Sequence, residues 1–217
     1  MILSLDTTSE FGSIALTDAD RTVEEIPLHS PDGFGHILFR RIEQLLARHA
    51  VNLNQVDCFA AASGPGSFTG VRVGLTAVKG LAEASGKRVV AVSNLRALAF
   101  FGTAPLRATV LDARRGQVYG AVYDDRLAIV APEVVMKFPA WVATLPLDRF
   151  EFIALDFSPF RGSVDPAIPV ITAPHSLAAA IGCIASSEYQ HGRASDPAEI
   201  NANYVRRSDA ELFRTEP

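Results

Sequence analysis

Residues 63–75 read Ser-Gly-Pro-Gly-Ser-Phe-Thr-Gly-Val-Arg-Val-Gly-Leu, and this glycine-rich stretch decides the fold of the chain. It follows a short apolar run at 56–62, which predicts a buried strand. It precedes a segment at 71–84 that carries few charges, which predicts a helix. Glycine and the Pro-Gly pair indicate a tight turn in which backbone segments approach closely. The sequence therefore predicts a strand, a glycine loop and a helix in succession.

The glycine loop can be interpreted as a phosphate site or as a structural loop. Backbone N–H groups at the start of a helix attract anions. The spacing differs from the familiar nucleotide loops, because Val71 follows Gly70 where a P-loop has lysine, and Thr69 stands where the dinucleotide fingerprint has glycine. We therefore favour a loop that packs a helix tightly on a sheet. Its structural positions are Gly64, Gly66, Thr69 and Gly70.

Small residues line much of one face of the helix that follows the loop. Gly70, Gly74, Ala77 and Leu81 are spaced at i, i+4, i+7 and i+11, and Gly80 adds another small position. Glycine inside a helix costs about 1 kcal/mol relative to alanine, so several in one helix indicate that something approaches closely. The approaching group is either the chain's own sheet or a neighbouring helix, or it is a second protein.

The glycine loop and three other segments resemble one known protein family. GPGSFTGVRVGL at 64–75 is similar to the signature of the TsaB (YeaZ) family, and LDARRGQVY at 111–119 is similar to the turn that opens the family's second half. The opening ILSLDTT at 2–8 and the Tyr-Val-Arg element at 204–206 resemble further family segments. The resemblance spans nearly the whole chain and is weakest between about 132 and 203.

The resemblance implies a fold and a function. The fold is α/β, a duplicated ribonuclease-H-like architecture shared with actin, heat-shock chaperones and sugar kinases (ASKHA). It implies an N-terminal subdomain at 1–103 with the glycine loop and docking helices, and a smaller, degraded subdomain at 104–217. The implied function is that of a non-catalytic adaptor. It binds and activates the TsaD catalytic subunit, which makes threonylcarbamoyladenosine (t6A) next to the anticodon of tRNA, and it joins a TsaE-like ATPase in a larger complex.

The predicted elements repeat in two halves, in agreement with α/β architecture. In the first half we expect strands at 2–6, 13–17, 22–28, 56–62 and 88–92 and helices at 35–50, 71–84 and 95–101. In the second half we expect strands at 108–112, 117–123, 128–135, 152–155 and 170–172 and helices at 140–144 and 177–189. Asp6 and Asp112 each end an apolar strand that enters a hairpin. This internal similarity is weak alone, and the family resemblance supports it.

The helix predicted at 35–50 has an apolar stripe that includes Leu38, Ile42 and Leu45, with charged residues largely outside it. The simplest interpretation is one face on the domain core. The resemblance implies that this helix and the one after the glycine loop also contact TsaD or a second copy of the chain. The partner-interface residues are then expected to be His36, Ile37, Phe39, Arg40, Val71, Gly74, Leu75 and Val78.

The sequence predicts no catalytic residue. Actin-like ATPases carry Asp-x-Gly-Thr in the first hairpin, whereas Thr8 replaces the glycine here and two arginines occupy the second turn at 112–116. Asp6 and Asp112 are therefore assigned to a relic nucleotide site, and for Asp6 a role in capping the hairpin turn is favoured. The alternative function is a small ATPase or kinase of the actin-like superfamily that uses Asp6 and Asp112 around Mg²⁺. None of the five histidines forms an i, i+3 or i, i+4 pair, so no helical metal motif exists.

Net charge, apolar run length and cysteine content limit the kinds of partner and compartment that we expect for this chain. The net charge is −4, which disfavours autonomous tRNA binding, so tRNA contact is expected only through a partner. Apolar runs are too short for a membrane span, no secretory signal is evident, and Cys58 and Cys183 are expected to be free thiols. These features favour a cytoplasmic protein that binds no cofactor independently, with ATP and Mg²⁺ used by partner enzymes. The balance between homodimer and heterodimer stays open.

Overall fold

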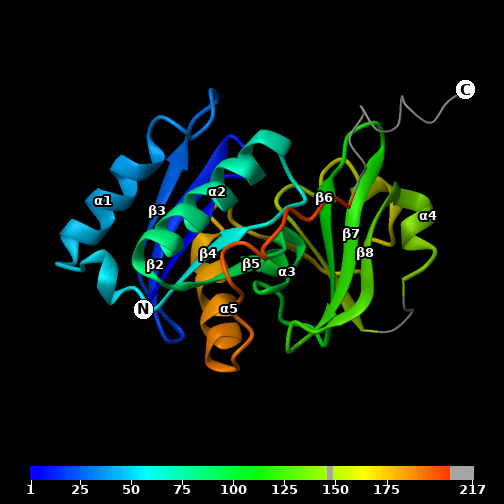
Figure 1. Ribbon diagram of the computed structural model, residues 1–217. Coiled ribbons are helices and arrows are strands. Elements are labelled where there is room, and N and C mark those ends of the chain that lie inside the picture. The colour runs from blue at the N-terminus through cyan, green and yellow to red at the C-terminus, as the bar shows by residue number, and fades with distance from the viewer. Residues whose placement is uncertain (146–148, 206–217) are drawn as a thin grey trace, which may run out of the picture. The chain divides into compact units, whose positions relative to one another are not determined.

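The computed structural model describes residues 1–145 and 149–205, which form two compact units (Figure 1). Among the described residues, unit 1 contains 1–97 and 174–202, and unit 2 contains 98–145, 149–173 and 203–205. Each unit is built around its own five-stranded sheet. Within the described residues, no helix is both long and apolar enough to cross a membrane.

The sheet of unit 1 has the strand order β3-β2-β1-β4-β5. The first three strands pair antiparallel, and β4 and β5 continue parallel to β1. The strands are β1 (Ile2–Asp6), β2 (Phe11–Asp18), β3 (Arg21–His29), β4 (Cys58–Ala62) and β5 (Arg88–Val92). The helices of this unit are α1 (Leu38–Arg48), α2 (Phe68–Ser85), α3 (Asn94–Ala99, which runs into unit 2) and α5 (Ala178–Gln190), with a 3-10 turn at Leu53–Gln55.

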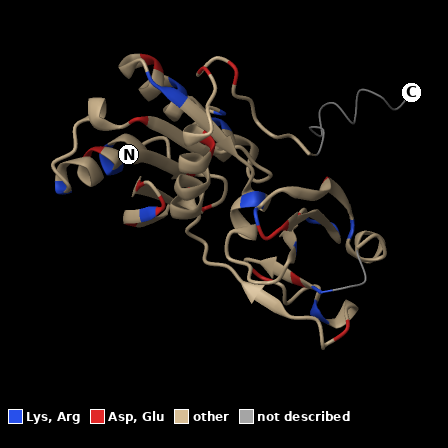
Figure 2. Ribbon diagram, turned by 90° about the horizontal axis from the view of Figure 1, so that it is seen from below, with Lys and Arg blue, Asp and Glu red and all other residues tan. Residues whose placement is uncertain are grey.

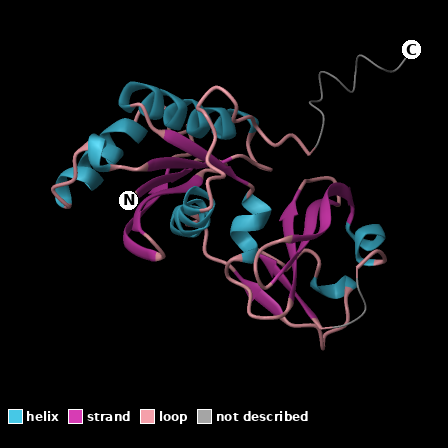
Figure 3. Ribbon diagram, turned by 60° about the horizontal axis from the view of Figure 1, so that its bottom comes forward, coloured by secondary structure: helices cyan, strands magenta, loops and turns pink. Residues whose placement is uncertain are grey.

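Helices cover both faces of the first sheet (Figure 3). Side chains alternate along a strand, so β1 supplies both layers. Leu3 and Leu5 belong to the core that α1 and α2 close. Ser4 points the other way, and its Oγ donates to the Ala178 carbonyl of α5 at 2.7 Å. A buried hydroxyl needs such a partner, and α5 supplies it.

Helix α5 belongs to unit 1, although the sequence analysis assigned all of 104–217 to the second subdomain. The helix packs on β1, β2 and β4, and Gly182 allows the close approach. A Cβ at Gly182 would lie 2.7 Å from the Thr17 methyl carbon and 2.8 Å from the Ser4 hydroxyl. The chain therefore returns to its first sheet after completing the second one.

The sheet of unit 2 has the order β10-β9-β6-β7-β8. Its strands are β6 (Leu106–Asp112), β7 (Gln117–Asp124), β8 (Ile129–Lys137), β9 (Phe150–Ala154) and β10 (Val170–Thr172). It also carries α4 (Phe138–Val142) and a 3-10 turn at Arg161–Ser163. Three antiparallel strands are again followed by two parallel ones, in the same spatial order as in unit 1. The duplicated ribonuclease-H-like fold is thereby confirmed.

Aromatic side chains fill the core of unit 2. Phe138, Trp141, Phe152, Phe157 and Phe160 are buried, and their ring centroids lie between 4.6 and 6.2 Å apart in the contacting pairs. Such separations are typical of attractive aromatic pairs. Gly120 on β7 makes room for Trp141, because a Cβ there would lie 2.4 Å from the indole ring.

Most predicted elements are present, with shifts at their ends. α1 begins at Leu38 rather than at 35, because residues 34–37 form a turn in which the Phe34 carbonyl accepts from the Ile37 and Leu38 amides. α2 begins at Phe68, three residues before the predicted start. Ser67 is the N-cap, and its hydroxyl accepts from the Gly70 amide at 3.3 Å.

Candidate functional site

The glycine loop packs against the first hairpin of unit 1. A Cβ at Gly70 would lie 2.0 Å from the Thr7 carbonyl oxygen, and one at Gly66 would lie 2.7 Å from the Thr8 side chain. Gly74, one turn further along α2, approaches the Thr7 hydroxyl in the same way, at 2.6 Å. Only glycine fits at these three positions, because any larger residue would have to displace backbone or buried side chains.

Hydrogen bonds complete the contact between loop and hairpin. The Ser67 amide donates to the Thr8 carbonyl at 2.7 Å, and the Thr7 hydroxyl donates to the Gly70 carbonyl at 2.7 Å. Buried Asn94 joins both segments, since its Oδ1 accepts from the Gly64 amide at 3.0 Å and its Nδ2 donates to the Thr8 hydroxyl at 2.7 Å. Protein atoms therefore fill the space over this hairpin turn.

Asp6 is buried beneath the same turn. Its Oδ1 accepts from the Thr8 amide at 2.9 Å and from the Thr8 hydroxyl at 2.7 Å. Burial raises the pKa of Asp6 above its ordinary value, and the hydrogen bonds from Thr8 and Asn94 act in the opposite direction. In this arrangement the carboxylate organises the hairpin turn.

Asp112 occupies the equivalent position in unit 2 and makes the same local contact. Its Oδ1 accepts from the Arg114 amide at 2.8 Å, two residues on, as Asp6 accepts from Thr8. Unlike Asp6, Asp112 is exposed, and its second oxygen lies 3.8 Å from the Arg114 guanidinium. The two aspartates belong to different units, so the structure describes no joint site for them.

The predicted partner residues of α1 lie largely at the surface. His36, Phe39 and Arg40 are exposed, Phe39 to 56%, and Ile37 is half-buried against the core. α1 and α2 cover the same face of the sheet and share one core cluster (Figures 1 and 3). The outer side of this helix pair is the surface that a partner could reach.

The predicted partner residues of α2 lie inside unit 1. Val71, Gly74, Leu75 and Val78 are buried between α2 and the sheet, because the small-residue face packs on β1 and β4. The outer side of α2 carries other residues. Phe68 is 45% exposed, and the Arg72 guanidinium lies 3.7 Å from the centre of its ring, a cation–π contact.

Sequence reasoning missed Phe68, Arg72 and Asn94. Phe68 and Arg72 are one helical turn apart, and this spacing could have indicated their contact. Asn94 lies two residues after the strand predicted at 88–92, where Asn commonly begins a helix. The Arg206 of the predicted Tyr-Val-Arg element lies outside the described residues, whereas Tyr204 is 48% exposed.

The described residues form no metal-ligand cluster and no broad surface of a single charge sign (Figure 2). Basic and acidic residues are interspersed in both units (Figure 2). Across the described ranges, no group of three or more His, Cys, Asp or Glu side chains converges to hold a metal ion. Free Cys58 is buried, and that burial raises the pKa of its thiol to about 12, so it stays protonated at neutral pH.

Comparison with known proteins finds a family model and relatives that match more than half of this chain. The family model described as TsaD, tRNA N6-adenosine threonylcarbamoyltransferase, matches residues 27–157, more than half of the chain. The chain is 38% identical over 122 residues to the tRNA threonylcarbamoyladenosine biosynthesis protein TsaB of Haemophilus influenzae, covering 54% of this chain and 51% of that protein. It is 31% identical over 148 residues to the TsaB of Escherichia coli, covering 62% and 64% respectively. The matches thus span about half to two-thirds of the relatives' length.

A solved structure agrees with the fold. YeaZ from Pseudomonas aeruginosa superposes with a TM-score of 0.81 at 24% identity, covering 94% of this chain and 98% of that one. Both units therefore have counterparts in one solved protein.

Proposed function

This chain belongs to the TsaB (YeaZ) family, and from that premise we propose that it takes part in t6A biosynthesis as a non-catalytic, cytoplasmic partner of a TsaD-type transferase. In this proposal the chain binds and activates TsaD, and TsaD carries out the transfer to tRNA. ATP and Mg²⁺ are used by partner enzymes, including a TsaE-like ATPase in a larger complex. Contact with tRNA is made through the partner.

The observation that carries the proposal is the exposed outer side of α1 and α2. Phe39 and Phe68 are large aromatic side chains that are 56% and 45% exposed. Arg40 directly follows Phe39, Arg72 lies one helical turn after Phe68, and both arginines are exposed. Aromatic residues and arginine are enriched at protein interfaces, where they supply most of the binding energy. This helix pair is therefore the surface through which we expect the partner to bind.

The non-catalytic role is supported by the closed first hairpin. In unit 1, Gly66 and Gly70 pack directly against Thr8 and Thr7 of the first hairpin, and the Ser67 amide donates to the Thr8 carbonyl. The Thr8 amide and hydroxyl, the donors that a phosphate would need here, already donate to Asp6 Oδ1 at 2.9 and 2.7 Å. A phosphate group would have to displace these contacts, so independent ATP hydrolysis by this hairpin is disfavoured.

The same surface could pair with a second copy of the chain when TsaD is absent. An isologous dimer would bury the same patch on both copies. Binding of TsaD and dimer formation would then compete for Phe39 and Phe68.

Size-exclusion chromatography with light scattering on the chain alone and mixed with its cognate TsaD tests the proposal. A new one-to-one complex is expected. Absence of a complex, with and without ATP and Mg²⁺, would contradict the proposal. In that case, ATP hydrolysis by the isolated chain would support the alternative of an independent ATPase.

A further inference from the structure

Unit 2 contains an open pocket with a volume of about 370 Å³. The turn between β6 and β7 forms one side, with Arg114 and Arg115, and the segment after β9 forms the other, with Pro159, Phe160 and Ser163. Pro139 at the start of α4 adds to the wall. The volume lies at the small end of the range for ligand pockets, which is about 300–1,000 Å³.

The duplicated fold shows how the segment after the fourth strand differs between the two units. In unit 1 the loop after β4 closes on the first hairpin through Gly66 and Gly70, whose missing side chains allow contact with Thr7 and Thr8. The equivalent segment after β9 has no glycine between 155 and 161. It carries Pro159 and Phe160, and the pocket lies between this segment and the second hairpin. The same position in the fold is thus filled in one unit and open in the other.

The pocket lies where α/β sheets commonly bind ligands. β6 and β9 are parallel neighbours, and the pocket residues follow the carboxyl ends of both strands. Ligands of open α/β sheets bind in the crevice outside these carboxyl ends.

The second hairpin also has an unusual backbone. Arg114 and Arg115 both adopt left-handed conformations, with φ of 65° and 55°, and Gly116 follows at 69°. Such φ values are uncommon outside glycine, asparagine and aspartate, and they concentrate at functional sites. Two arginines in succession at such positions are poorly explained by turn formation, which asparagine or glycine would achieve at lower cost.

The charges of the pocket favour an anion. Asp112 is the carboxylate in the lining, and it lies 3.8 Å from the Arg114 guanidinium, so the two largely offset each other. Arg115 is exposed and has no ion pair within residues 1–145 and 149–205. An arginine fork holds a phosphate through two parallel hydrogen bonds. Pro139, Pro159 and Phe160 in the lining offer an apolar surface for a planar ring.

We propose that this pocket binds a nucleotide, with its phosphate held by Arg115 and Arg114 and its base against Pro139, Pro159 and Phe160. The nucleotide could be a free mononucleotide or one residue of a single-stranded RNA, because both present the same phosphate and base. Binding involves no hydrolysis. The pocket uses elements of unit 2 only, so it is independent of the α1–α2 surface and of the proposed adaptor role.

Isothermal titration calorimetry on the full chain tests the proposal. The probes are adenosine monophosphate, a five-nucleotide single-stranded RNA, adenosine and inorganic phosphate. We expect the first two to bind, and adenosine and phosphate to bind at least tenfold more weakly than the better of them. Arg115→Asn removes the charge and keeps a residue that tolerates left-handed φ, so the fold should be unchanged. It should weaken binding about tenfold.

Arg149→Asn is the matched control. Arg149 is also an exposed arginine of unit 2 with a left-handed φ of 53°, but it does not line the pocket. This variant should bind the probes as the original chain does. Tighter binding of the RNA than of the mononucleotide would identify an RNA strand as the source, and the reverse would identify a free nucleotide.

Three results would overturn the proposal: no binding of either nucleotide probe at millimolar concentration, equal binding of adenosine or phosphate, or equal weakening by Arg115→Asn and Arg149→Asn. Complex formation with TsaD should be the same for Arg115→Asn and the original chain. Failure of this pocket proposal is therefore distinguishable from failure of the adaptor proposal.

Discussion

Gly70 and Thr7 are in such close contact that a Cβ on Gly70 would lie 2.0 Å from the Thr7 carbonyl oxygen. Real Cβ atoms do not approach oxygen so closely, and the obstacle is backbone rather than a flexible side chain. This contact joins the start of α2 to the first hairpin. It explains why a glycine is needed at a position where a helix would otherwise favour alanine.

Gly70→Ala should therefore lower the free energy of unfolding by about 3 kcal/mol, the scale of overpacking in a well-packed site. Gly80→Ala on the same helix is the control, because a Cβ at Gly80 meets nothing within 4 Å. That substitution should raise the free energy of unfolding by about 0.5–1 kcal/mol through better helix propensity. Urea denaturation of both variants provides the measurement. Equal effects would show that close packing does not explain the glycine loop.

The buried carboxyl group of Asp6 should make the stability of unit 1 depend on pH. Burial raises the pKa of Asp6 above its ordinary 3.8, so the folded state holds a proton that the unfolded state has lost. Stability then falls as pH rises from about 3.8 through the higher folded-state pKa. Asp6→Asn removes this titration and leaves an oxygen to accept from Thr8.

The stability of Asp6→Asn relative to the original chain should accordingly increase as pH rises from about 4 to the raised pKa that Asp6 has in the folded state. Urea denaturation at several pH values measures the difference. Asp112→Asn, which alters the same kind of turn at an exposed site, is the control for loss of a carboxylate. A difference between Asp6→Asn and the original chain that stays constant with pH would contradict the prediction.

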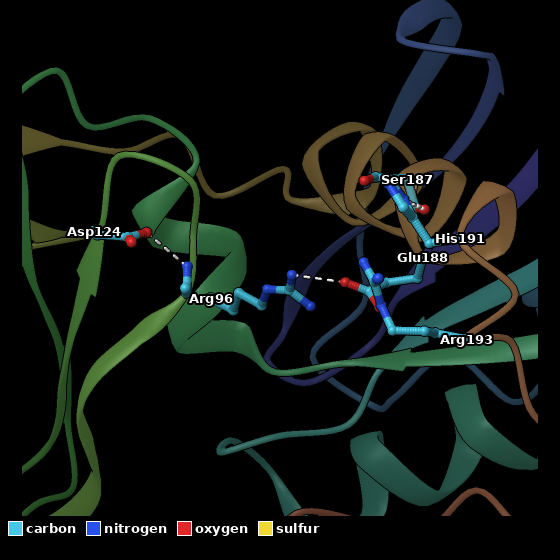
Figure 4. Close-up of polar contacts among 7 residues, drawn as sticks. Arg96, Asp124, Ser187, Glu188, His191 and Arg193 are labelled. Carbon is cyan, nitrogen blue, oxygen red and sulfur yellow. Dashed lines mark hydrogen bonds and ion pairs between the residues drawn. The ribbon is translucent and has the colours of Figure 1, made fainter.

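Glu188 near the end of α5 should stabilise unit 1 at neutral pH. Its carboxylate accepts from Arg193 and, at 2.7 Å, from Arg96 at the start of α3 (Figure 4). The Arg193 hydrogen bond is the main cause that lowers the pKa of Glu188 below its ordinary 4.5, although burial acts in the opposite direction. The contribution of Glu188 to stability is present above about pH 4.5. It is lost as pH falls through the lowered pKa that Glu188 has in the folded state.

Glu188→Gln should lower the free energy of unfolding by about 1–2 kcal/mol at pH 7, since it weakens two charge-assisted hydrogen bonds. The difference should shrink as pH falls below 4.5. Glu83→Gln on the exposed side of α2 should have little effect at any pH. Thermal unfolding of both variants at pH 7 and pH 4 measures these changes, and a loss for Glu188→Gln that is independent of pH would argue against the ionic contribution.

The fold could be predicted from sequence to a large extent because its signals are local. The apolar strand before the glycine loop and the loop itself follow from residue type and spacing, whereas the internal repeat was weak in the sequence and was supported by the family resemblance. The return of α5 to the first sheet could not be predicted, because it depends on a contact between Gly182 and Thr17 that are 165 positions apart. A helix with apolar residues on most sides does not reveal which sheet it will cover.

The candidate surface was predicted only in part. Gly74 and Val78 were expected at a partner interface, but small and apolar residues suit the chain's own sheet equally well, and the sheet occupies them. Phe39 was expected at the interface as part of the apolar stripe of the helix predicted at 35–50, and it is exposed. Phe68 was missed because it stood in the predicted loop rather than at the first position of α2.

The most direct test of the central claim is light scattering of TsaD mixtures with variants of the outer surface of α1 and α2. The double variant Phe39→Glu and Phe68→Glu adds charge to exposed positions, so it should fold normally and lose the complex with TsaD. Tyr189→Glu is the control, because Tyr189 is 39% exposed on α5, which covers the opposite face of the same sheet. We predict a one-to-one complex for the original chain and for Tyr189→Glu, and separate components for the double variant. A complex of undiminished affinity with the folded double variant would contradict the account.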